Sequence, residues 1–199
     1  FFVNGEYDKR DAPGLVWEAT RSGVPAGPNT SRTTSTDLDL VSSTLQSRYG
    51  YNTGPYEKLG NFNTESKRIL ARLDWNISKE HTFSLRYNWM EGTDDQVTNG
   101  TSAPNPRASS NRWSRNSMSY ESSLYNFTNK VSSLSAELKS RFSNNLSNQL
   151  LATFTKISDL RGSTSSPFPF VDIWKDGDSY ISFGYELFSY KNQVENKVF

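Results

Sequence analysis

The amino-acid sequence predicts an all-β fold: an antiparallel up-and-down meander of about six strands, part of a transmembrane β-barrel, with long extracellular loops and one short loop helix. Three observations predict it. Apolar and polar residues alternate along several segments, which is the period of a strand with two different faces. Two connections between these segments are tight, and the others are long and rich in Gly, Pro, Ser, Thr and Asn. Aromatic residues make up 14% of the chain, although only 34% of its residues are hydrophobic.

This composition suits a barrel because only alternate strand residues face lipid, while the lumen and the outer loops are polar. On composition alone, a soluble all-β domain with long loops is the commoner architecture. No apolar run approaches the ~20 residues of a membrane-spanning helix. The net charge of +1 gives no strong field for nucleic acid, and the absence of Cys excludes disulfides and thiolate metal sites.

The clearest alternation lies within Ser66–Glu91. Apolar residues occupy every second position from Ile69 to Ile77 and again from Phe83 to Trp89, and Leu70 is the only apolar residue on the other face. The segment is therefore predicted to be a β-hairpin, with a three-residue turn at 79–81.

Charge is used to choose the register of this hairpin. Directly opposed residues share a face, and like charges placed opposite each other are unfavourable. A register that opposes Asp74 to Arg86, and Trp75 to Leu85, avoids setting Arg72 against Arg86. We therefore expect an Asp74–Arg86 pair.

A second hairpin and two flanking strands complete the meander. Alternation in Leu134–Phe142 and Leu146–Thr155 surrounds a turn at Ser143–Asn145. Short strands are expected at Phe1–Tyr7 and within Tyr180–Phe199, with no face assigned.

The hairpins define two expected faces. The face expected to meet lipid comprises Ile69, Ala71, Leu73, Trp75, Ile77, Phe83, Leu85, Tyr87, Trp89, Leu138, Leu150, Ala152 and Phe154. The face expected to line the lumen comprises Arg72, Asp74, Asn76, Ser84, Arg86, Asn88, Glu137, Lys139, Arg141 and Gln149. Trp75 and Phe83 near the turn, with Tyr87 and Trp89 toward the other end, fit two interfacial aromatic girdles. Alternatively, the two tryptophans belong to the core of a β-sandwich.

The long connections, at about 8–65, 92–123 and 158–179, all fall at one end of the meander. Loops of this length argue against an ordinary compact domain and are typical of the extracellular side of outer-membrane barrels. The first contains a predicted helix, capped by Thr36 and ended by Gly50, with Leu38, Val41 and Leu45 at helical spacing.

No motif indicates an enzyme, a cofactor or a metal site. His81, the single histidine, lies in the predicted turn and gives little support to a metal site or a catalytic triad. Asp176–Asp178 and Asp37–Asp39 resemble fragments of a calcium loop, but a turn and a helix start explain them better. No Gly-rich phosphate loop or nucleophile elbow is present.

Ligand contact is the better functional hypothesis for the loops, where aromatic and cationic groups can stack on sugars or apolar side chains and pair carboxylates. Packing of the loops against each other is the alternative, and the more common one. The candidate residues are Trp113, Arg115, Tyr120, Phe168, Phe170 and Trp174.

Several strings in the strands resemble a known family. Arg72–Ser78 followed by His81–Asn88 is similar to a barrel hairpin of TonB-dependent receptors of Bacteroidetes, of the Oar-like type. Phe1–Tyr7, Phe142–Leu146 and Tyr190–Val194 resemble other parts of that barrel, so the likeness covers the strands over most of the chain. These strings carry no catalytic residues.

The resemblance implies a large barrel, commonly of ~22 strands, in the cell outer membrane of a Gram-negative bacterium. It also implies an N-terminal plug that couples through TonB to inner-membrane energy and admits an extracellular nutrient, a peptide or an oligosaccharide. The expected partners are therefore outer-membrane lipid, TonB through the plug, the nutrient and a candidate surface lipoprotein, with no nucleic acid. Residues 1–199 are expected to be a partial barrel domain without signal peptide, plug or TonB-contacting segment. The alternatives are a secreted carbohydrate-binding or adhesin-like β-sandwich and a passive porin.

Overall fold

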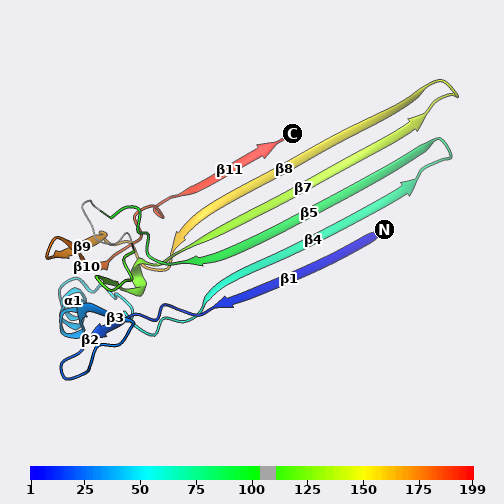
Figure 1. The fold of residues 1–199 in the computed structure, drawn as a ribbon. Coiled ribbons are helices and arrows are strands. Elements are labelled where there is room, and N and C mark those ends of the chain that lie inside the picture. Colours follow the sequence, from blue (N-terminus) through cyan, green and yellow to red (C-terminus); the bar gives the residue numbers. More distant parts are fainter. Residues whose placement is uncertain (104–110) are drawn as a thin grey trace.

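The computed structural model describes residues 1–103 and 111–199, and its largest feature is a six-stranded antiparallel sheet (Figure 1). Neighbouring strands of this sheet follow one another in chain order, as a meander requires. The strands are β1 (Phe2–Ala12), β4 (Phe62–Asn76), β5 (His81–Gln96), β7 (Tyr125–Arg141), β8 (Ser147–Ser163) and β11 (Gln193–Val198).

Two tight turns join neighbouring strands at one end of the sheet, and all longer connections lie at the other end (Figure 1). In the β4–β5 turn, the Ser78 hydroxyl accepts hydrogen bonds from the backbone N–H groups of Glu80 and His81. The β7–β8 turn is closed by the bond from the Phe142 N–H to the Leu146 carbonyl. The second turn lies at Ser143–Asn145 as the sequence predicts, because hydroxyl and amide side chains stabilise tight turns locally, whereas the first lies at 78–80, one residue before the predicted 79–81, and His81 is the first residue of β5.

The predicted register of the first hairpin is wrong by two residues. Arg72 lies opposite Arg86, and Asp74 lies opposite Ser84 rather than Arg86. The charge argument fails because Arg72 turns along its own strand: its Nε and Nη2 donate to Asp74 Oδ1 over 2.9 and 2.8 Å. Since Asp74 compensates Arg72 on the same strand, the opposed arginines do not forbid this register.

The two expected faces are nevertheless present, because a slip of two residues keeps every side chain on its own face. Rows of directly opposed residues run across the strands on the apolar face, as in the row Leu73–Leu85–Ala136–Ala152. Every residue placed on a face by the sequence pattern lies on that face in the strands, except Ile77, which follows the end of β4.

No second layer of the described chain covers the apolar face. Leu73 and Trp75 are 47% and 59% exposed, and Leu150 is 60% exposed. The buried hydrophobic cluster lies instead among the connections, around residues such as Leu38, and includes none of the apolar-face residues of the sheet. The sheet is therefore a single layer with two open faces (Figure 1).

The connections fold into a layer of their own, which we call the loop layer (residues 13–61, 97–103, 111–124 and 164–192). It contains a parallel pair of strands, a second sheet in the order β6-β10-β9, and two short helices. These elements are β2 (Glu18–Thr20), β3 (Thr30–Thr34), α1 (Ser35–Tyr49), β6 (Met118–Ser119), η1 (Glu121–Ser123), β9 (Val171–Lys175) and β10 (Asp178–Phe183).

The predicted helix is present but begins earlier than expected. Thr34, not Thr36, is its N-cap, and the Thr34 hydroxyl accepts a hydrogen bond of 3.1 Å from the Asp37 N–H. The helix ends at Gly50, which has a left-handed φ of 64°. Leu38 and Leu45 are buried in the loop layer.

The sheet strands extend further into the connections than the alternation predicts. Pairing continues to Ala12 on β1 and to Gln96 on β5, although hydrophobic alternation has stopped there. Tyr180, placed by the sequence in a flanking strand, belongs to β10 in the loop layer. Backbone pairing needs no apolar side chains, and a polar strand end is therefore invisible to a hydrophobic pattern.

Candidate functional site

The polar face of the sheet carries charges that are paired with one another. Glu6 on β1 and Arg68 on β4 approach to 3.6 Å between Oε1 and Nη1. The Asp74 carboxylate accepts a hydrogen bond from the Arg72 guanidinium and another, of 2.8 Å, from the Ser84 hydroxyl. These carboxylates are therefore held in place by fixed donors, which suits a hydrated wall better than proton transfer.

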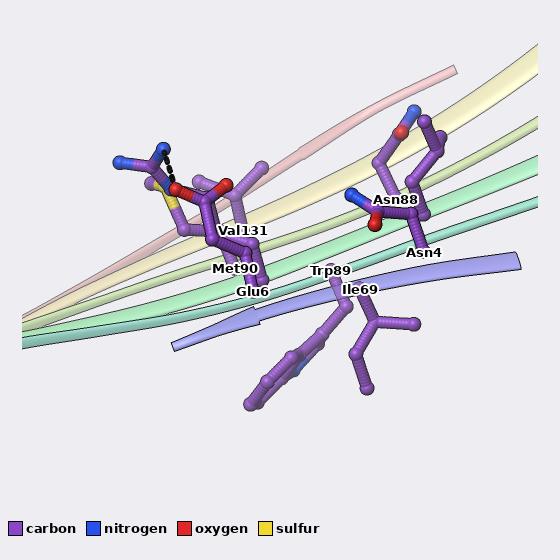
Figure 2. A pocket seen from close by; sticks show the side chains of 9 residues that line it. Asn4, Glu6, Ile69, Asn88, Trp89, Met90 and Val131 are labelled. Carbon is purple, nitrogen blue, oxygen red and sulfur yellow. Dashed lines mark ion pairs between the residues drawn. The ribbon is translucent and has the colours of Figure 1, made fainter. Parts of the chain in front are cut away.

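A shallow hollow of about 280 Å³ lies on this face where β1, β4, β5 and β7 run side by side. Figure 2 shows Asn4, Glu6 and Asn88 on one side of the sheet, with Ile69 and Trp89 pointing to the opposite side. Apolar side chains of Leu70, Met90 and Val131 line the hollow beside its amide, carboxylate and guanidinium groups, and the arrangement contains no nucleophile with an adjacent base.

The loop layer is anchored on the loop-side end of this polar face. Arg161 of β8 donates from Nε and Nη2 to both carboxylate oxygens of Glu186, over 3.0 and 2.5 Å. The same guanidinium lies 3.9 Å from the ring centroid of Tyr125 and 5.2 Å from that of Phe188. Because the Glu186 side chain is fully buried, this ion pair and its aromatic shell fix the 184–190 segment over the polar face.

A second buried ion pair lies inside the loop layer. Arg112, whose side chain is 1% exposed, pairs through two hydrogen bonds with Asp172 of β9, and its guanidinium lies 4.7 Å from the Phe170 ring centroid. Sequence reasoning missed both Arg112–Asp172 and Arg161–Glu186. The partners are far apart in the chain and follow no periodic pattern, so a single sequence carries no signal for them.

The six residues predicted to contact a ligand occupy different environments. Trp113 and Tyr120 are buried in the core of the loop layer, where the Trp113 ring N–H donates to Thr98 over 3.0 Å. Arg115 is exposed, and Trp174 of β9 is half-buried. Phe168 and Phe170 are also half-buried.

Phe168 and Phe170 line the same groove, of about 420 Å³, between the segments 167–170 and 185–190. Phe168 stacks on Tyr51 with a centroid separation of 4.1 Å. Gly184 lets the two segments approach, because it has a φ of 109° and a Cβ there would lie 2.2 Å from the Pro169 carbonyl oxygen. Exposed Leu187 also lines this groove.

Two tyrosines and one aspartate of the loop layer have shifted pKa values. Burial raises the pKa of Tyr120. Burial, and then a hydrogen bond to Asp39, raises the pKa of Tyr56 to about 12. Hydrogen bonds from Tyr180 and Thr34 lower the pKa of Asp37. All three shifts have structural causes, and none lies beside a nucleophile.

In the described residues, no cluster of three or more His, Cys, Asp or Glu side chains could hold a metal ion. Asp176 and Gly177 form the left-handed turn between β9 and β10, as predicted, and Asp37 lies in the first turn of α1. The His81 ring makes an edge contact with Phe142, with centroids 5.9 Å apart.

Comparison with known proteins gives no match. No family model, no curated protein and no solved structure matches this chain. None of the described helices is long and apolar enough to cross a membrane.

Proposed function

We propose that the six-stranded sheet is part of the wall of an outer-membrane β-barrel of the TonB-dependent receptor type, which takes up a nutrient across the outer membrane. One observation carries the proposal: the sheet has a continuous apolar face that no described part of the chain covers, and an opposite face that is polar. Large continuous apolar patches are rare on soluble monomers. Hydrocarbon is the environment in which such a face is stable.

The dimensions of the apolar face support a lipid partner. On β4 and the residue that follows it, the apolar side chains extend over nine residues, from Ile69 to Ile77. A tilted transmembrane strand needs ~9–11 residues to cross the hydrocarbon. The strands continue beyond this zone on the loop side, as they do in barrels that project from the membrane.

The opposite face supports a hydrated lumen. Its charges are paired across and along the strands, as in Glu6–Arg68 and Arg72–Asp74, and are therefore neutralised without a covering layer. The interior of a transmembrane barrel is likewise polar. The pairs serve as lining, and no step of chemistry is assigned to them.

The ends of the sheet support an orientation. Tight turns are periplasmic in outer-membrane barrels, and long connections are extracellular. The loop layer would then lie outside the cell, over the mouth, because Glu186 and Phe188 contact the polar face through Arg161. The groove lined by Phe168 and Phe170 is the best place for the first contact with a peptide or an oligosaccharide. Coupling to TonB rests on the family resemblance of the strand sequences alone.

Two alternatives remain in different classes. A secreted β-sandwich, adhesin-like or carbohydrate-binding, needs a second sheet over the apolar face, and the described residues do not provide one. A passive porin shares the wall and the lumen but needs no energy from the inner membrane.

The test is to fractionate cells that make the intact protein and then measure uptake. We expect the protein to stay in the outer-membrane fraction after an alkaline wash, and its uptake of labelled peptides or oligosaccharides to stop when TonB is removed. Uptake that persists without TonB would instead indicate a porin. Recovery of the protein in the soluble fraction would overturn the membrane assignment.

A further inference from the structure

Charged residues, whose cations are all lysines, border the apolar face on its loop side. We call this border the lysine belt; it contains Lys9, Lys67, Lys130, Lys156 and Lys197, with Glu65, Glu91 and Glu195 between them. Every strand of the sheet contributes to the belt. Row by row, it begins where the apolar side chains end: Trp89 is followed on its face by Glu91, and Phe154 by Lys156.

The chemistry of the cations differs between the two faces. All five strand cations on the apolar face are lysines, whereas six of the seven on the polar face are arginines. The polar-face cations are Arg10, Arg68, Arg72, Arg86, Lys139, Arg141 and Arg161. A lysine can lay its flexible apolar stem along a hydrocarbon surface and extend its ammonium group into water. The belt therefore has the residue type that suits the edge of a bilayer.

The belt also crosses the strands at a slant. The apolar band begins at Ile69 on β4 and at Leu134 on β7, and Leu134 lies in the row of Ala71, so the edge moves by two residues over two strands. At ~3.3 Å per residue and ~4.8 Å between strands, this is a slant of about 35°. Strands of outer-membrane barrels are tilted by ~35–45° from the barrel axis.

The lysines are displaced in the same direction, by four residues over the five strand spacings from Lys9 to Lys197, which is a slant of about 29°. Lys67 and Lys130 share one row, while Lys156 and Lys197 lie one row nearer the turns, and Lys9 lies one row nearer the loops. The belt is thus close to a straight line when the strands are tilted as they would be in a barrel. A line of this kind is what a membrane plane would define.

Within the belt, the lysine side chains are more exposed than the glutamate side chains with which they pair. Lys130 lies 2.9 Å from Glu91, and Lys156 lies 2.8 Å from Glu195. The lysine side chains are between 41% and 52% exposed, and those of the three glutamates between 24% and 37%. Asp11 and Asp95 lie on the same face in a row nearer the loops, and when they are counted the five lysines are balanced by five carboxylates. A partner that approaches this edge therefore contacts more lysine than glutamate side-chain surface.

We infer that the lysine belt binds the anionic phosphate headgroups of membrane lipid on the loop side of the barrel. A partner for this surface must be apolar where it meets the band and anionic where it meets the belt, and a phosphate-headed lipid has both parts in that order. The inference rests on the proposed function, because it requires the apolar band to be in a bilayer. It adds which headgroup chemistry is selected and which residues select it.

The experiment measures lipid selectivity of the intact protein in phosphatidylcholine vesicles by electron spin resonance. Spin-labelled phosphatidic acid and spin-labelled phosphatidylcholine are compared for their fraction of motionally restricted, protein-bound lipid. We expect phosphatidic acid to be preferred about threefold, and the preference to weaken with added salt. In a variant with Lys130→Gln, Lys156→Gln and Lys197→Gln, the preference should disappear.

Two matched variants control for charge and for folding. Arg10→Gln, Arg68→Gln and Lys139→Gln remove as many cations from the polar face and should leave the preference unchanged. Lys130→Arg, Lys156→Arg and Lys197→Arg retain the belt charge and should also retain it. The inference would be overturned if the unsubstituted protein restricts lipid without preferring phosphatidic acid. It would also be overturned if the variant with three glutamines in the belt keeps that preference. If no lipid is restricted at all, the proposed membrane function itself fails.

Discussion

Leu150 and Leu151 provide a matched pair for testing the two faces. They are neighbours on β8, with exposed fractions of 60% and 59%, and they point to opposite faces of the sheet. Leu150 lies on the apolar face, two residues on the turn side of the central row that ends at Ala152, whereas Leu151 lies on the polar face opposite Glu137.

In water, replacing either exposed leucine with arginine should change stability by less than ~0.5 kcal/mol. In a bilayer the two substitutions separate. Leu150→Arg places a charge in the hydrocarbon between its middle and the turn-side interface and should cost ~1–3 kcal/mol, about 5-fold to 150-fold in the folding equilibrium. Leu151→Arg should cost little, because it enters a hydrated face and meets a carboxylate.

The assay is folding of the intact protein into phosphatidylcholine vesicles, followed by urea titration of each variant. Both variants are compared with the unsubstituted protein under the same conditions. Equal penalties for the two positions, or a larger penalty for Leu151→Arg, would refute the assignment of the apolar face to lipid.

Three further predictions concern the loop layer. Glu186→Ala leaves Arg161 without its buried partner and should destabilise the loop layer by about 3 kcal/mol, measured as faster proteolysis of the 164–192 connection. Gly184→Ala puts a Cβ against the Pro169 carbonyl at positive φ and should cost ~1–3 kcal/mol, seen as a lower urea midpoint. Tyr56 should ionise at about pH 12, and its raised pKa means that its contribution to stability is complete below pH 10 and is lost as pH rises toward 12. Ultraviolet titration, with Tyr56→Phe as the blank, tests this; a phenol that titrates at its ordinary pKa would contradict it.

The sequence predicted the sheet well because the sheet is governed by local rules. A two-residue alternation places Leu73 and Arg72 on different faces whatever the exact pairing, and hydroxyl and amide clusters mark turns such as Ser143–Asn145. Registers depend on more than opposed charges, and the Arg72–Asp74 contact along one strand was enough to invalidate the argument used for the first hairpin.

The loop layer was largely unpredicted for a different reason. Its core joins residues from three connections, as when the Tyr120 hydroxyl donates to the Leu38 carbonyl, and no period in the sequence links them. Arg112 and Glu186 are buried only because their partners arrive from elsewhere in the chain. Charged residues in a polar loop carry no sign of this in one sequence. Similarly, the helix cap at Thr34 was misplaced because Thr36 is an equally good capping residue.

The most direct test of the central claim is an accessibility scan along β8. The chain has no cysteine, so single cysteines introduced from Ser147 to Ser163 can be spin-labelled one at a time in the vesicle-embedded intact protein. At Leu150, Ala152 and Phe154 we expect high collisional access for dissolved oxygen and low access for a water-soluble nickel complex. At the positions between them we expect low access for oxygen and high access for the nickel complex. Low access for both reagents at Leu150, Ala152 and Phe154 would show that protein, not lipid, covers this face.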